Sequence, residues 1–150
     1  MNTLTLYVID TTCIISYFCE IFCQESKIST QARKIIQNAL CQQEGEIKIS
    51  IPSIVFVELF EKWLRNEEFA KKFFYEVYIA ITQSPNIEIK SLDQEVVLAL
   101  LEIDGILLNH DIHDKIVLAS AISLGCKLIT TDNKIIDYIE KTKIIPGVIN

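Results

Sequence analysis

The chain has 150 residues, half of them hydrophobic, and a formal net charge of −6. A chain of this length can bury a substantial core as one domain, and its apolar content excludes a disordered protein. The acidic balance argues against broad, nonspecific binding to a phosphate backbone, so any contact with nucleic acid has to be local or assisted by a metal.

Cysteine usage and the N-terminal segment indicate a cytoplasmic protein. The five cysteines are an odd number and contain no C-x-x-C pair, which favours reduced thiols. The opening stretch MNTLTLYVID has no basic segment and its apolar run ends at Asp10, while the next apolar run is broken at Glu20. We therefore expect neither a signal peptide nor a membrane span.

Short runs rich in β-branched residues alternate along the chain with longer segments of helical periodicity. Strands are expected within residues 5–10, 46–51, 86–92, 126–130 and 143–148. Helices are expected over residues 12–22, 30–43, 53–65, 67–82, 94–103, 112–124 and 133–141. The alternation predicts one α/β domain over residues 1–150, a three-layer α/β/α arrangement around a parallel sheet of about four to five strands.

Proline and glycine mark several of these boundaries. Pro52 suits the first turn of the helix that follows the second strand. Gly125 suits the C-terminus of a helix directly before residues 126–130, and Gly45 is expected to have the same part before residues 46–51.

Two aspartates follow predicted strands. Asp10 closes the first strand and Asp132 comes shortly after residues 126–130; parallel α/β sheets bind ligands beyond the carboxyl ends of their strands. With only four glycines, the chain has neither of the glycine-rich phosphate loops, and it has no G-x-S-x-G serine motif. Carboxylate chemistry is what remains.

Each of these acids also has a purely structural interpretation. Asp10, Asp111 and Asp132 all precede a predicted helix and could act as its N-cap. Asp114 lies at the position where a capping box favours Glu or Gln. Glu58 differs because it lies inside the apolar helical run IVFVELF, and a buried lone carboxylate needs a partner or a cation. Spacing alone leaves open whether Glu58 faces inward or lies beside Glu61 and Lys62 on the surface.

The two histidines and the aromatic segment near the middle of the chain are expected to have structural roles. His110 and His113 lack a third ligand at zinc-type spacing, so a loop or cap role is expected. The segment FAKKFFYEVYIAI, residues 69–81, carries more apolar side chains than one helix face normally buries. Part of it is therefore expected to lie in a homodimer interface.

Three blocks, taken together and in this order, resemble the PIN-domain family. They are YVIDTTCII from residue 7, ISIPSIVFVELFE from residue 49 and HDIHDKIVLASAISLGCKLITTD from residue 110. The family comprises metal-dependent nucleases, among them the toxins of VapBC-type toxin–antitoxin pairs. The resemblance implies an endoribonuclease that uses Mg²⁺ or Mn²⁺ and leaves a 5′-phosphate and a 3′-hydroxyl. It also implies an RNA substrate, often a homodimer, and for a toxin an antitoxin partner.

The resemblance assigns residues as well. It makes four acids both metal ligands and catalytic residues: Asp10, Glu58, Asp114 and Asp132. Thr12 and Thr130 would line the site, and Asp111 matches a less critical acid at the helix start. Lys115 is a candidate phosphate contact, with a solvated helix lysine as the alternative. A role in RNA processing outside a toxin–antitoxin pair uses the same residues, and a noncatalytic binding scaffold with its acids as caps is the remaining alternative.

Overall fold

A computed structural model describes residues 3–41, 43–103, 105 and 110–150 of the chain. Its strands are β1 (Thr5–Ile9), β2 (Ile47–Pro52), β3 (Ile87–Lys90), β4 (Lys127–Ile129) and β5 (Val148–Ile149). Its helices are α1 (Thr11–Tyr17), α2 (Cys19–Phe22), α3 (Thr30–Ala39), α4 (Ser53–Trp63), α5 (Glu67–Phe73), a π-helical turn η1 (Phe74–Tyr78), α6 (Ile79–Gln83), α7 (Gln94–Glu102), α8 (Ile112–Leu124) and α9 (Asn133–Thr142).

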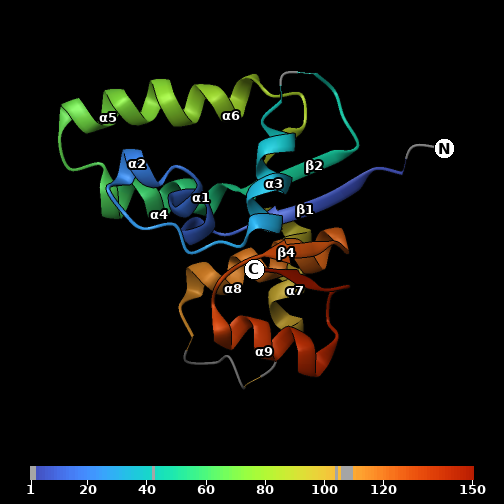
Figure 1. Cartoon of the computed structure of the whole chain (residues 1–150). Helices are drawn as coiled ribbons and strands as arrows, with labels where there is room; N and C mark the ends of the chain where they lie inside the picture. Colours follow the sequence, from blue (N-terminus) through green and yellow to red (C-terminus); the bar gives the residue numbers. More distant parts are fainter. Residues whose placement is uncertain (1–2, 42, 104, 106–109) are drawn as a thin grey trace.

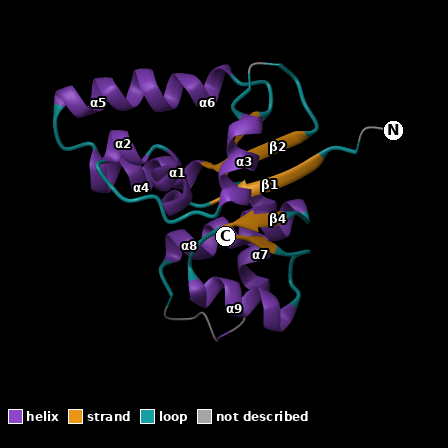
Figure 2. Ribbon diagram, in the orientation of Figure 1, coloured by secondary structure: helices purple, strands orange, loops and turns teal. Residues whose placement is uncertain are grey.

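The strands form one parallel sheet in the order β3-β2-β1-β4-β5. Helices lie on both faces of the sheet, which gives the predicted α/β/α arrangement (Figures 1 and 2). β1 lies at the centre, with Val8 opposite Ser50 of β2 on one side and Leu128 of β4 on the other. Since β1 and β4 are neighbours and run in the same direction, the residues that follow them meet at one edge.

The core fills the space between the sheet and its helices. Val8, Ile9, Leu128 and Ile129 are almost completely buried, as expected for central strands of a parallel sheet that is covered on both faces. α8 contacts β1, β2 and β4, and α7 packs along α8. A smaller apolar cluster from α7 and α8 joins these two helices. The start of α8 is thereby fixed near the carboxyl ends of β1 and β4.

Several predicted boundaries differ from the observed ones. The expected helix over residues 12–22 is divided at Phe18 into α1 and α2, and α3 ends at Ala39, short of residue 43. The last strand is Val148–Ile149 and not residues 143–148, because Lys143 is the left-handed C-cap of α9 and the chain bends before it joins the sheet. Gly45 does not end a helix: its N–H donates to Asn86 Oδ1 in the loop before β2.

Among the described residues, no helix combines the length and the apolar character needed to cross a bilayer.

Candidate metal centre at the carboxyl edge of the sheet

Asp10 follows β1 and is buried. Its Oδ1 accepts the backbone N–H of Cys13 at 2.9 Å and the hydroxyl of Thr12 at 3.0 Å, and its Oδ2 accepts the hydroxyl of Thr130. Burial raises the pKa of Asp10, while these hydrogen bonds oppose the rise. Asp10 is thus both the N-cap of α1 and a buried carboxylate that ionises at a cost.

Thr130 links the ends of β1 and β4. It is almost fully buried, its hydroxyl donates to Asp10, and its Oγ1 accepts the backbone N–H of Asp132 at 3.1 Å. Asp132 in turn caps α9: its Oδ1 accepts the N–H groups of Lys134 and Ile135. The second oxygen, Oδ2, points away from the cap and lies 2.9 Å from His110 Nε2.

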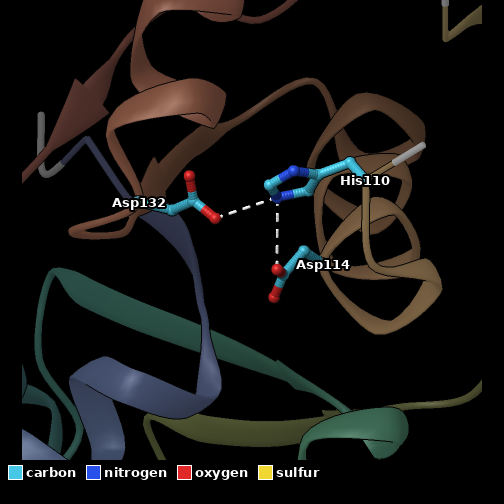
Figure 3. A group of neighbouring side chains, drawn as sticks. All are labelled: His110, Asp114 and Asp132. Carbon is cyan, nitrogen blue, oxygen red and sulfur yellow. Dashed lines mark hydrogen bonds and ion pairs between the residues drawn. The ribbon is translucent and has the colours of Figure 1, made fainter. Parts of the chain in front are cut away.

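Asp114 comes from the first turn of α8 and faces Asp132 across His110. Its Oδ2 lies 3.2 Å from the same His110 Nε2 (Figure 3). The pKa of Asp114 is raised to about 6, first by burial and then by the negative charges of Asp132 and Glu58, against the opposing effect of His110. Mutual repulsion of this kind is expected where carboxylates share one small space.

The side chain of Glu58 faces the site and not the surface of α4. It is buried on α4, only 6% exposed, although its Oε1 lies 3.3 Å from Nζ of the more exposed Lys62. Its other oxygen, Oε2, lies 3.6 Å from Nδ1 of His113. His113 also lies 3.2 Å from Oδ1 of Asp111, the N-cap of α8. Glu58 therefore faces the other acids and is held between two basic side chains.

These acids border one open cavity of about 520 Å³. Its lining comprises Asp10, Thr12, Lys27, Glu58, Lys62, Asp111, Asp114, Thr131 and Asp132. Thr130 lies beneath it, in a much smaller space of about 10 Å³ that Asp10, Asp114 and Asp132 also border. The basic side chains that line the larger cavity, within the described parts of the chain, are Lys27 and Lys62. Lys115 is half-buried and is absent from that lining.

The structure brings together the four acids that the sequence predicts as ligands, and it places His110 beside two of them. His110 was expected to have a loop or cap role, yet its ring is inserted between two of the selected acids. The spacing of His110 and Asp114, four residues apart at a helix start, was the available signal. Cys13 also lies beside Asp10, but burial and that negative charge raise the pKa of its thiol, which keeps it neutral.

The fold and site define a class: an α/β protein with carboxylates gathered where parallel strands end. The sequence matches the family model of the PIN domain over residues 7–141. The chain therefore belongs to the PIN-domain family, whose members are nucleases that typically use divalent metals. No curated protein matches the sequence.

Several solved structures have a similar fold. VapBC2 of Rickettsia felis, bound to a fragment of its promoter DNA, aligns with a TM-score of 0.63 and 13% identity, covering 96% of this chain and 97% of that one. FitAcB of Neisseria gonorrhoeae gives a TM-score of 0.62 at 14% identity and 96% coverage of both chains. A toxin–antitoxin complex of Klebsiella pneumoniae gives 0.54 at 19% identity, again with 96% of both. At these identities the likeness concerns the fold.

Proposed function

We propose that this protein is a metal-dependent endoribonuclease that hydrolyses phosphodiester bonds of RNA. The observation that carries the proposal is the convergence of four carboxylates from four separate elements on one cavity: Asp10, Glu58, Asp114 and Asp132. Helix capping accounts for Asp10 and Asp132 individually. It does not account for Glu58 in the middle of α4, nor for the direction in which all four side chains point.

The donor set fits a hard divalent cation. Carboxylate oxygens are the ligands that Mg²⁺ and Mn²⁺ prefer, and the raised pKa values of Asp10 and Asp114 reflect a desolvation and repulsion cost that a cation would offset. We assign Asp10, Asp114 and Asp132 as the main ligands and Glu58 as a ligand or the base that orients the attacking water. A bound dication acidifies and positions water and stabilises charge on the phosphodiester.

The other residues of the site support this chemistry. Thr130, Thr12 and the backbone N–H of Cys13 hold the carboxylate of Asp10 in one orientation. Lys27 and Lys62 place positive charge on the lining of a cavity that is otherwise acidic. We propose that they receive phosphates of the RNA that flank the reacting one, because a protein with net charge −6 needs local contacts of this kind. They replace Lys115 as the favoured phosphate contacts.

For the biological role, we propose the toxin of a toxin–antitoxin pair, acting in the cytoplasm. The toxin–antitoxin origin of the structural neighbours supports this role. An apolar groove of about 520 Å³ between α4 and the α5–α6 segment, lined by Phe56, Phe60, Phe73, Phe74 and Tyr78 among others, offers a surface for an antitoxin. An RNA-processing nuclease would use the same carboxylates. A reading frame for a small protein with a basic N-terminal part, immediately upstream of this one, would favour the toxin.

The activity is tested with purified protein and an RNA substrate. With Mg²⁺ or Mn²⁺ the wild type should cleave RNA, and excess EDTA should abolish cleavage. Asp10→Asn and Asp114→Asn should each lower the rate by about 100-fold or more, because each removes a charge from the cation site. Asp137→Asn is the matched control: it makes the same chemical change at an exposed position of α9. Cleavage that persists in excess EDTA, or that survives both site substitutions, would reject the mechanism.

A further inference from the structure

The side chain of His110 is aimed at the point where two acids of the site meet. Its Nε2 lies 2.9 Å from Oδ2 of Asp132 and 3.2 Å from Oδ2 of Asp114. The ligand atoms of the three residues all lie within 4.8 Å of one another. Figure 3 shows one nitrogen of the ring directed toward both carboxylates, which reach it from different elements.

The contacts of His110 differ from an ordinary surface ion pair in burial and in the number of partners. The His110 side chain is only 13% exposed, and the same nitrogen serves both carboxylates. Asp132 contacts His110 through Oδ2 alone, because its other oxygen, Oδ1, caps α9. An imidazole nitrogen at the meeting point of two carboxylate oxygens can donate a proton to them, or it can share a cation with them through its lone pair.

We propose that His110 Nε2 is a nitrogen ligand of the cation held by Asp114 and Asp132, and that it shifts the preference of the site from Mg²⁺ toward Mn²⁺ and other first-row transition ions. The inference rests on the proposed function, because it concerns the same cation site. Mg²⁺ favours oxygen donors almost exclusively, whereas imidazole binds first-row transition ions well. Two carboxylates and one imidazole therefore form a mixed donor set suited to Mn²⁺.

His113 provides a matched control. It lies three residues from His110, at the start of α8, and its Nδ1 also contacts acids, at 3.2 Å from Asp111 and 3.6 Å from Glu58. It does not belong to the group of converging ligand atoms found among the described residues. A change at His113 therefore removes an imidazole that contacts acids, as a change at His110 does, without removing a donor from the point shared by Asp114 and Asp132.

The test uses Mn²⁺ as a spectroscopic probe of the full-length chain. Pulsed electron paramagnetic resonance of the Mn²⁺-loaded wild type should show modulation from a directly coordinated ¹⁴N nucleus. The modulation should vanish in His110→Gln and persist in His113→Gln. Labelling of the wild type with ¹⁵N-histidine should replace the ¹⁴N pattern, and this measurement keeps the test decisive if His110→Gln fails to fold. Calorimetry should show that His110→Gln weakens Mn²⁺ binding by about tenfold or more and Mg²⁺ binding by much less.

The possible results separate this inference from the proposed function. Mn²⁺ that binds and supports RNA cleavage without histidine ¹⁴N coupling would overturn the role of His110 and leave the nuclease in place. His110 would then be only a hydrogen-bond partner of Asp114 and Asp132. Absence of any Mn²⁺ or Mg²⁺ binding would instead overturn the cation site itself. Equal losses of affinity for the two ions in His110→Gln would also contradict nitrogen ligation.

Discussion

At the residue scale, the main feature is that site acids also cap helices. Asp10 caps α1 and Asp132 caps α9, and both carboxylates also border the cavity of the site. Because the two interpretations coexist, loss of activity on substitution with alanine does not distinguish a ligand from a cap. Asparagine does distinguish them, because it caps a helix about as well as aspartate but lacks the charge.

We therefore predict that asparagine at a ligand position changes the melting temperature differently in the absence and in the presence of Mg²⁺. Without metal, Asp10→Asn and Asp114→Asn should melt at or above the wild-type temperature, because each substitution relieves burial and repulsion of a charge. Mg²⁺ at about 100 times its Kd should stabilise the wild type by about 2.7 kcal/mol, or about 5–10 °C for a chain of this size. Both variants should lose most of that gain.

Asp111→Asn is the comparison for these melts. Asp111 caps α8 through the N–H of His113, and its carboxylate is more exposed than those of Asp114 and Asp132. The variant should resemble the wild type with and without Mg²⁺. If Asp10→Asn and Asp114→Asn keep the full metal-induced shift, the acids do not form a cation site, and the noncatalytic scaffold becomes the better explanation.

The sequence predicted some site residues better than others, for physical reasons. Asp10 and Asp132 could be placed together because each follows a strand of a parallel sheet. The direction of Glu58 could not be predicted, because helical spacing does not say which face of α4 meets the cavity. The position of His110 depends on the path of the chain into α8, and that path is set by tertiary packing and not by local pattern.

At the scale of elements, α8 shows what local signals can predict. Its observed bounds, Ile112–Leu124, equal the predicted range, because Asp111 caps its start and Gly125 ends it in the left-handed conformation at φ +63°. No glycine or proline marks the break at Phe18 between α1 and α2. Cys23, the C-cap of α2, adopts a left-handed backbone conformation although it is not a glycine. Such boundaries follow from packing.

The end of α8 gives a stability prediction. Gly125→Ala should lower the free energy of unfolding by about 1 kcal/mol, because a residue with a Cβ atom is strained in the left-handed region. The added methyl group would meet no atom within 4 Å, so the loss would be conformational and not steric. Urea unfolding measures this change in the free energy of unfolding, and the m-value should stay the same in the variant. Gly45→Ala, equally uncrowded and without a left-handed backbone, should be neutral; equal values for both variants would contradict the argument.

At the scale of the whole molecule, the sequence predicted the class of fold but not the order of its strands. Alternation of strands and helices requires a covered parallel sheet. The order β3-β2-β1-β4-β5 requires the chain to pass from the edge strand β3 across β2 and β1, to add β4 on the far side of β1. No local residue pattern encodes that crossing, although it is what brings β4, and with it Asp132, beside β1.

The predicted homodimer gains a second candidate face from the structure. In the α5–α6 segment, Phe73, Val77 and Ile81 are buried in the core of the protein. Many of the apolar side chains that suggested an interface there are therefore already covered within one chain. On α7, by contrast, Val97, Leu98 and Leu101 are exposed, Leu101 to 79%. An uncovered apolar helix face is typical of an interface, and we expect α7 to pair with a second copy of the chain.

Light scattering under reducing conditions should therefore show a dimer of the wild type. Leu101→Glu should shift it to a monomer, because a charge would then be buried at the interface. Tyr75→Glu, at an exposed position of η1, should leave the dimer intact. A dimeric Leu101→Glu together with a monomeric Tyr75→Glu would place the interface in the aromatic segment, residues 69–81. A wild type that is monomeric at all workable concentrations would contradict the predicted dimer.

The double use of Asp10 and Asp132 also has a genetic consequence. Codons for aspartate and asparagine differ at a single base, and asparagine retains the cap that α1 and α9 need. A point mutation can therefore inactivate the proposed nuclease while leaving a full-length, folded chain with its surfaces unchanged. Such a chain would still occupy its binding partners, so we expect inactive alleles of this kind to act on the wild-type copy in the same cell and not simply as missing protein.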